Sequence, residues 1–85
     1  MVAFKEAHAD KHMMLGLRIA YFRKMRGLTQ EQFAELIDKS AGYLAAIEAT
    51  GVDNAISMDT LFDIAEALNV PAYKFLQFDS DDEMA

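Results

Sequence analysis

Apolar side chains in the middle of the chain follow the spacing of an α-helix in two short segments. Phe33, Ala34 and Ile37 stand at i, i+1 and i+4, and Leu44 and Ile47 stand at i and i+3. Each segment therefore carries one narrow apolar stripe. The pattern predicts two short amphipathic helices whose apolar faces are turned together.

Capping residues mark where these two helices begin. Thr29 is expected to be the N-cap of the first, and Gln32 completes a capping box that satisfies the first free backbone N–H groups. Residues 38–40, Asp-Lys-Ser, form a short polar break that supplies a second capping position. Ala34 has no side chain beyond Cβ, so it suits a site at which a second helix crosses closely. Together these features predict a helix-turn-helix.

A longer helix is predicted before this unit. Leu15, Ile19 and Phe22 repeat at i, i+4 and i+7 and predict a helix over residues 13–26. This face is expected to pack on the core. Gly27 then ends the helix in a left-handed cap.

Two further helices are predicted after the unit. Ser57 is expected to cap a helix over Met58–Leu68. Pro71 suits the first position of a last short helix that ends at Leu76, and Phe75 is expected to lie in the core. The residues expected to form the buried stripe of the longer helix are Leu61, Ile64, Ala65 and Leu68.

Several stretches carry a family resemblance. Residues 27–34, Gly-Leu-Thr-Gln-Glu-Gln-Phe-Ala, together with Tyr43-Leu44 and Ile47-Glu48, resemble the Cro and lambda-repressor type of helix-turn-helix family, often called XRE-like. The resemblance covers about Met14 to Phe78. It implies an all-α fold, a compact five-helix, lambda-repressor-like DNA-binding domain. We therefore expect a short N-terminal extension over residues 1–12, the helix-turn-helix domain over 13–78 and a disordered acidic tail over 79–85.

The resemblance also implies roles for residues inside the domain. Arg23 stands where relatives often have an arginine that pairs with the equivalent of Glu48, which implies a structural pair that clamps the motif against the first helix. Asp38 stands where the family usually has a left-handed glycine, and Asp tolerates that conformation better than most residues. In relatives the C-terminal end often forms a dimer contact. Here that end carries Tyr73, Leu76 and Phe78.

The second helix of the motif is the expected DNA-reading element. In related repressors its start and outer face reach into the major groove, where donors and acceptors read the bases. Here only Ser40 and Tyr43 on this face can form hydrogen bonds, so direct readout is expected to be poor. Phosphate contacts are expected from helix N-termini and from polar groups near them. The candidate DNA-binding residues are Gln30, Lys39, Ser40, Ala41, Gly42, Tyr43, Ala46 and Asn54.

The charge balance opposes a simple DNA-binding interpretation. The chain of 85 residues carries 8 Lys and Arg against 14 Asp and Glu, a net charge of −6, whereas DNA-binding proteins usually present a basic face. Residues 1–28 hold six basic and two acidic side chains, and residues 29–85 hold two basic and twelve acidic ones. For Arg18, Lys24 and Arg26 the sequence leaves two roles open, solvated surface or phosphate contact.

Other functional classes find little support in the sequence. The chain has no cysteine, which excludes a disulfide framework and thiolate metal sites. No enzyme or cofactor is expected, because there is no nucleophile beside a histidine, no glycine-rich phosphate loop and no metal cluster. His8 and His12 are four residues apart, but without a third ligand we interpret them as surface histidines. With no apolar run of about 18 residues and no signal-peptide pattern, we expect a cytoplasmic protein without a membrane span.

Two functions remain. The first is a DNA-binding transcriptional regulator, sequence-specific or weakly specific, that binds double-stranded DNA as a homodimer. Dimerisation is expected because a domain of this size buries only about 60% of its unfolded surface. The second is a protein-protein interaction module on the same scaffold that has lost base readout, which the Ala/Gly-rich helix, Leu36, Tyr43 and the acidic C-terminal part favour. We favour the first.

Overall fold

The computed structural model describes residues 8–49 and 56–78 of the chain. Within these residues it contains helices and no strand, which confirms the all-α prediction. Residues 1–7, Asn54 and the stretch 79–85 lie outside the described residues, so the expectations for them stay predictions. The elements are α2 (Ala9–Met25), α3 (Gln30–Leu36), α4 (Ala41–Glu48), α5 (Met58–Leu68) and the 3₁₀-helix η1 (Ala72–Leu76).

The elements differ from the predicted ones mainly at their ends. α2 begins at Ala9, whereas the apolar periodicity predicts a start at Met13. The expected fifth helix is a 3₁₀-helix, and Pro71 precedes it directly instead of opening it. No helix among the described residues has the length and apolar composition needed to cross a bilayer.

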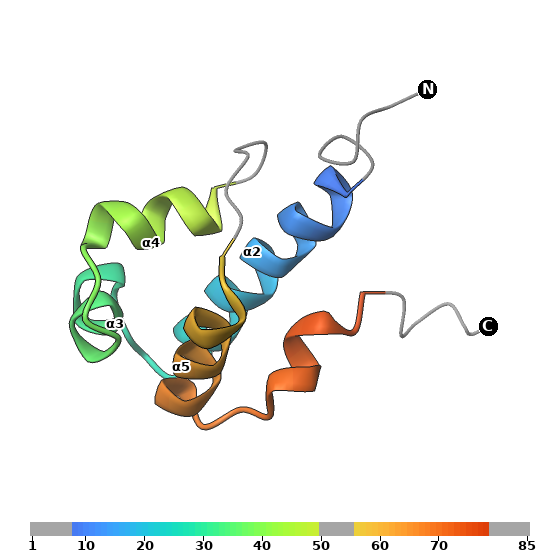
Figure 1. Cartoon of the computed structure of the whole chain (residues 1–85). Coiled ribbons are helices and arrows are strands. Elements are labelled where there is room, and N and C mark those ends of the chain that lie inside the picture. The colour runs from blue at the N-terminus through green and yellow to red at the C-terminus, as the bar shows by residue number, and fades with distance from the viewer. Residues whose placement is uncertain (1–7, 50–55, 79–85) are drawn as a thin grey trace.

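α2 runs through the middle of the molecule, and the other elements pack around it (Figure 1). The pair α3 and α4 lies on one side of α2 and η1 on the other, while α5 lies near the C-terminal end of α2. α2 contacts α4, α5 and η1, and α3 contacts α4. The first long helix is therefore the common support for both halves of the domain.

Three side-chain caps fix where the helices start. Thr29 Oγ1 accepts from the Gln32 N–H at 3.0 Å, and Gln32 Oε1 accepts from the Thr29 N–H at 2.9 Å, which completes the predicted capping box of α3. Ser40 caps α4 and Ser57 caps α5 in the same way, each from its hydroxyl oxygen. Such caps satisfy backbone donors that have no partner within the helix. The predicted helix starts at these three positions are confirmed.

The ends of α2 and α5 are joined by one arginine. Gly27, with a φ of 73°, ends α2 as predicted, and Asn69, with a φ of 56°, ends α5 in the same left-handed conformation. Arg26 Nε donates to the Leu68 carbonyl at 2.6 Å, and Arg26 Nη2 donates to the Asn69 carbonyl at 3.1 Å. The guanidinium thereby satisfies free carbonyls at the negative end of the α5 dipole.

The core gathers side chains from all five elements. Leu15 and Phe22 pack against it half-buried, and the Phe22 and Phe75 rings meet edge to face at 5.2 Å between centroids. The predicted α5 stripe is buried along its whole length, and Phe75 is buried as predicted. The largest fully buried side chains are Phe33, Phe75, Ile19, Leu44, Ile64 and Leu68.

Gly16 sets how closely α2 approaches α4. A Cβ atom at this position would stand 2.3 Å from the Ile47 carbonyl oxygen and 3.4 Å from the Glu48 Cα. Both are backbone atoms, which cannot rotate away as a side chain does. Glycine in a helix interior normally weakens the helix. At Gly16 the missing side chain weakens the helix locally, but it also allows α2 and α4 to cross closely.

We expect Gly16→Ala to destabilise the protein and Gly42→Ala to stabilise it. At Gly16 the clash with the Ile47 carbonyl outweighs the gain in helix propensity, so the free energy of unfolding should fall by about 1–2 kcal/mol. At Gly42 an added Cβ meets only Ser40 Oγ, at 3.9 Å, so the free energy of unfolding should rise by about 0.5–1 kcal/mol. Urea unfolding measures both. A Gly16→Ala variant at least as stable as the parent would contradict the close crossing.

Candidate nucleic-acid interface

The turn between α3 and α4 is held by local backbone bonds. Asp38 adopts a left-handed conformation with a φ of 59°, which agrees with the glycine-like position that the sequence assigns to it. The Lys39 N–H donates to the Ala34 carbonyl at 2.9 Å and closes the end of α3. Ser40 Oγ then accepts from the Tyr43 N–H at 3.0 Å and opens α4. These bonds within the turn therefore fix the orientation of α4 relative to α3.

A bidentate ion pair ties α4 to α2. Arg23 Nε donates to Glu48 Oε2 at 2.7 Å, and Arg23 Nη2 donates to Glu48 Oε1 at 2.9 Å. Arg23 Nη1 also donates to the Leu28 carbonyl at 2.7 Å. The guanidinium thus joins three parts of the chain: α2, the segment before α3, and the last turn of α4.

This ion pair is almost shielded from water. The Arg23 and Glu48 side chains are only 8% and 6% exposed. The hydrogen bond to the Glu48 carboxylate raises the pKa of Arg23 above its ordinary value, against the opposing effect of desolvation. Because each charge compensates the other in a nearly dry site, loss of either one leaves a buried charge without a partner.

Gln30, a predicted DNA contact, takes part in this network. Its Nε2 donates to Glu48 Oε1 at 3.0 Å, and its side chain is half-buried. The amide is therefore turned toward the ion pair. One N–H of the amide is engaged with Glu48, and the second N–H and the carbonyl oxygen are left for other contacts.

The remaining described DNA-contact candidates form the start and outer face of α4. Gly42 is exposed, whereas Ala41, Tyr43 and Ala46 are half-buried. The Lys39 ammonium lies 5.2 Å from the centroid of the Tyr43 ring, within the range of a cation–π interaction. Lys39, Ser40 and Gly42 thus make a small, open surface at the N-terminus of α4. Asn54 lies outside the described residues.

The basic residues of α2 do not all gather beside this surface. Arg18 Nη2 donates to the Gln77 carbonyl just after η1, and Arg26 donates to carbonyls at the end of α5. Both arginines are therefore turned toward the C-terminal side of the domain. Arg26 is exposed and Arg18 is half-buried, so both stay at the surface while they make these bonds. No sequence signal marks these bonds, because each joins residues far apart in the chain.

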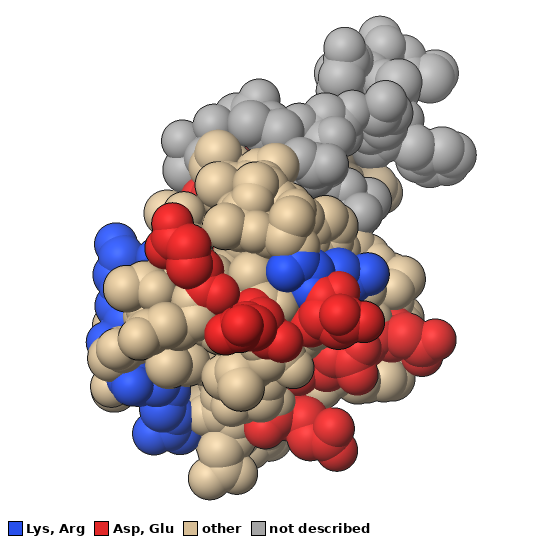
Figure 2. Space-filling view, turned by 90° about the vertical axis from the view of Figure 1, so that its left-hand side faces the viewer, with Lys and Arg blue, Asp and Glu red and all other residues tan. Residues whose placement is uncertain are grey.

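Acidic side chains dominate the face on which α3 and α4 lie. Figure 2 views the molecule from that side and has acidic side chains across its middle, with basic ones along one edge and in a second group directly above the acidic ones. The described acidic residues of α3, the turn and α5 are Glu31, Glu35, Asp38, Asp59, Asp63 and Glu66. A phosphate backbone that approaches α4 would therefore meet repulsion at its flank.

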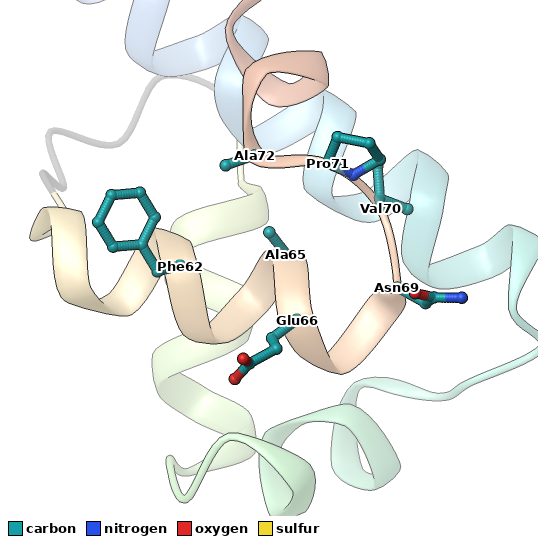
Figure 3. Close-up of a pocket in the computed structure, with 7 residues that line it drawn as sticks. All are labelled: Phe62, Ala65, Glu66, Asn69, Val70, Pro71 and Ala72. Carbon is teal, nitrogen blue, oxygen red and sulfur yellow. The ribbon is translucent and has the colours of Figure 1, made fainter.

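Shallow hollows lie on the surface of the described part of the chain. One hollow beside α5 has a volume of about 390 Å³ and lies between α5 and the segment that leads into η1 (Figure 3). Phe62 and Ala65 point toward Ala72 there, whereas Glu66 points away from it. Among the described residues, no three His, Cys, Asp or Glu side chains stand close enough together to hold a metal ion.

Comparison with known families identifies the α3–α4 unit. A family model described as helix-turn-helix matches residues 19–75. The match contains α3, α4 and α5 completely and extends from the middle of α2 into η1, so it covers more than half of the chain. No curated protein matches the chain significantly.

We expect Arg23→Met to be among the most damaging single changes in the domain. It strands the Glu48 carboxylate in a nearly dry site, which should lower the free energy of unfolding by about 3–5 kcal/mol. Thermal unfolding followed by circular dichroism measures the loss. The double change Arg23→Met with Glu48→Met should recover much of it, because no buried charge then remains.

Lys11→Met serves as the matched control on the same helix. Lys11 is exposed, so its replacement should change the free energy of unfolding by no more than about 0.5 kcal/mol. Equal losses for Arg23→Met and Lys11→Met would show that the ion pair does not stabilise the fold.

Proposed function

The chain belongs to the Cro/C1-type, XRE-like helix-turn-helix family of DNA-binding regulators, and from this premise we propose that it binds double-stranded DNA as a homodimer with weak base discrimination. The proposal places the protein in the cytoplasm, where a regulator meets the genome. The family is generally non-enzymatic.

The observation that carries the proposal is the rigid presentation of α4. Two capped helices, a left-handed turn and the Arg23–Glu48 pair hold α4 in place, while its N-terminal surface stays open. A helix that reads DNA needs this combination, because ordering a mobile side chain on binding costs free energy and so lowers the affinity. α4 has the support that a DNA-reading helix requires.

Weak discrimination follows from the side chains that α4 offers. The Ser40 hydroxyl accepts from the Tyr43 N–H, but its proton remains free to donate to a phosphate or a base. Lys39 can contact a phosphate as a point charge, and Ala41 and Ala46 can contact thymine methyl groups. A bidentate contact to a base contributes about 1–3 kcal/mol of discrimination, and the side chains of Ser40, Ala41 and Ala46 cannot make one.

The experiment that tests this proposal is selection from a randomised duplex pool at low and at near-physiological salt. Because DNA binding releases counterions, affinity should fall steeply as salt rises. We expect retention at low salt and enrichment of a two-fold sequence of low information content. Retention without enrichment would establish a non-specific binder, and no retention at low salt would refute DNA binding.

Lys39→Ala tests the phosphate contact in the same assay. If Lys39 meets a phosphate, its loss should weaken binding to all sequences and reduce the salt slope by about one unit per protomer. Lys11→Ala, on the exposed part of α2, is the control and should leave the slope unchanged. Identical slopes for Lys39→Ala and the parent would remove Lys39 from the interface.

Gly42→Gln should add the base readout that α4 lacks. Gly42 is exposed, and an added Cβ has room there, so a glutamine amide can reach an adenine edge. Selection with this variant should favour one base at one position of each half-site, with a preference of about 1–3 kcal/mol over the other bases. Gly42→Ala should add no such preference. If both variants select the same sequences as the parent, α4 does not lie in the major groove.

One observation favours a second candidate function, a protein-interaction module. Leu36 is 61% exposed and stands at the edge of a hollow of about 370 Å³ that Asp38, Asp63 and Glu66 also line. An exposed leucine ringed by carboxylates suits a basic protein segment better than it suits phosphate. Failure of DNA retention at low salt would make this the leading function.

A further inference from the structure

α2 carries a strip of exposed side chains that no part of the described chain covers. The strip consists of Asp10, Met13, Leu17, Tyr21 and Lys24, and all five are exposed. At about 100° per residue they fall within about 40° of Leu17 on either side of the helix. Leu17 and Tyr21 are 49% and 57% exposed, which is unusual for large apolar side chains in neighbouring turns.

The spacing within this strip is symmetric. The successive separations are three, four, four and three residues, so the order is the same from either end. The charges are opposite at the two ends, with Asp10 at one and Lys24 at the other. Among the described residues, neither of them forms an ion pair within its own chain.

We propose that this strip binds the same strip of a second copy, with the two α2 helices antiparallel and Leu17 on the two-fold axis. Leu17 then meets Leu17 of the second copy. Met13 meets Tyr21 of the second copy, and Asp10 meets Lys24 of the second copy, each twice by symmetry. Steps of three and four residues place side chains on one face of a helix, where they can pack against a second helix.

Charge selects the antiparallel arrangement. A parallel pair would bring Asp10 against Asp10 and Lys24 against Lys24, which repel. The antiparallel pair replaces both repulsions by two attractive pairs at its ends. Beside the strip, Met14, Leu17, Arg18 and Tyr21 line an open hollow of about 450 Å³, which gives apolar side chains of the second copy room to enter.

This antiparallel dimer rests on the homodimer of the proposed function and adds the surface through which the two copies bind. Gly16 faces α4 and precedes Leu17, so α4 lies about 100° around α2 from the seam. The two-fold axis of an antiparallel pair runs perpendicular to both helices and to the line between them. It therefore leaves both α4 helices on the same side of the dimer.

Sedimentation velocity of the full chain without DNA tests the proposal. Leu17→Glu should weaken self-association by about a hundredfold or more, because two carboxylates would meet on the axis. Leu76→Glu, at the C-terminal end where relatives often dimerise, is the matched control. Both leucines are about half exposed, so circular dichroism should find both variants folded.

A charge swap tests the antiparallel register directly. Asp10→Lys alone and Lys24→Asp alone should each weaken self-association by about tenfold, since each turns two attractive pairs into repulsive ones. The double variant Asp10→Lys with Lys24→Asp should restore it. A purely structural role of either residue predicts no such rescue.

Three results would overturn the proposal: a parent chain that stays monomeric, loss of the dimer in Leu76→Glu but not in Leu17→Glu, or no rescue in the double variant. Because no DNA is present, failure here leaves the duplex-pool result standing. The reverse outcome, a dimer through α2 that retains no DNA, refutes the DNA-binding proposal alone.

Discussion

The ion pair between Arg23 and Glu48 is the constraint on which the arrangement of the domain depends. α4 has only eight residues, too few for a stable isolated helix, so its order comes from its neighbours. Glu48 lies in its last turn, where the helix dipole disfavours a negative charge. Arg23 offsets that cost and at the same time fixes the distance between α2 and α4, which Gly16 allows to be short.

The second constraint is how the chain uses its cations. Arg18, Arg23 and Arg26 each bind carbonyl or carboxylate groups inside the domain. Most of the acidic residues that the structure describes are exposed, and many face the side of α3 and α4 (Figure 2). A DNA-binding protein built in this way neutralises few phosphates, so its affinity depends on shape and on backbone donors more than on net attraction.

Much of the fold follows from local sequence. Thr29, Ser40 and Ser57 begin helices in the structure as the capping pattern predicts, because a cap involves residues only three apart. The close contact at Gly16 is not among the predicted features, although a glycine inside a helical pattern signals a close packing contact. Gln30 is a predicted DNA contact, and its bond to Glu48, 18 residues away, is an interaction that the sequence does not predict. Periodicity identifies a buried face, but it does not identify the distant group that a long polar side chain reaches.

The bonds from α2 to the end of the domain have a consequence for synthesis. Arg18 and Arg26 reach partners 59 and 42 residues further along the chain, and Phe22 packs on Phe75. During synthesis α2 leaves the ribosome before α5 and η1. The side chains of Arg18, Phe22 and Arg26 therefore lack their partners until these later elements have also been synthesised. A nascent chain stalled before η1 would present the apolar face of α2 to chaperones and proteases. Formation of η1 is therefore the step that covers the part of α2 around Phe22.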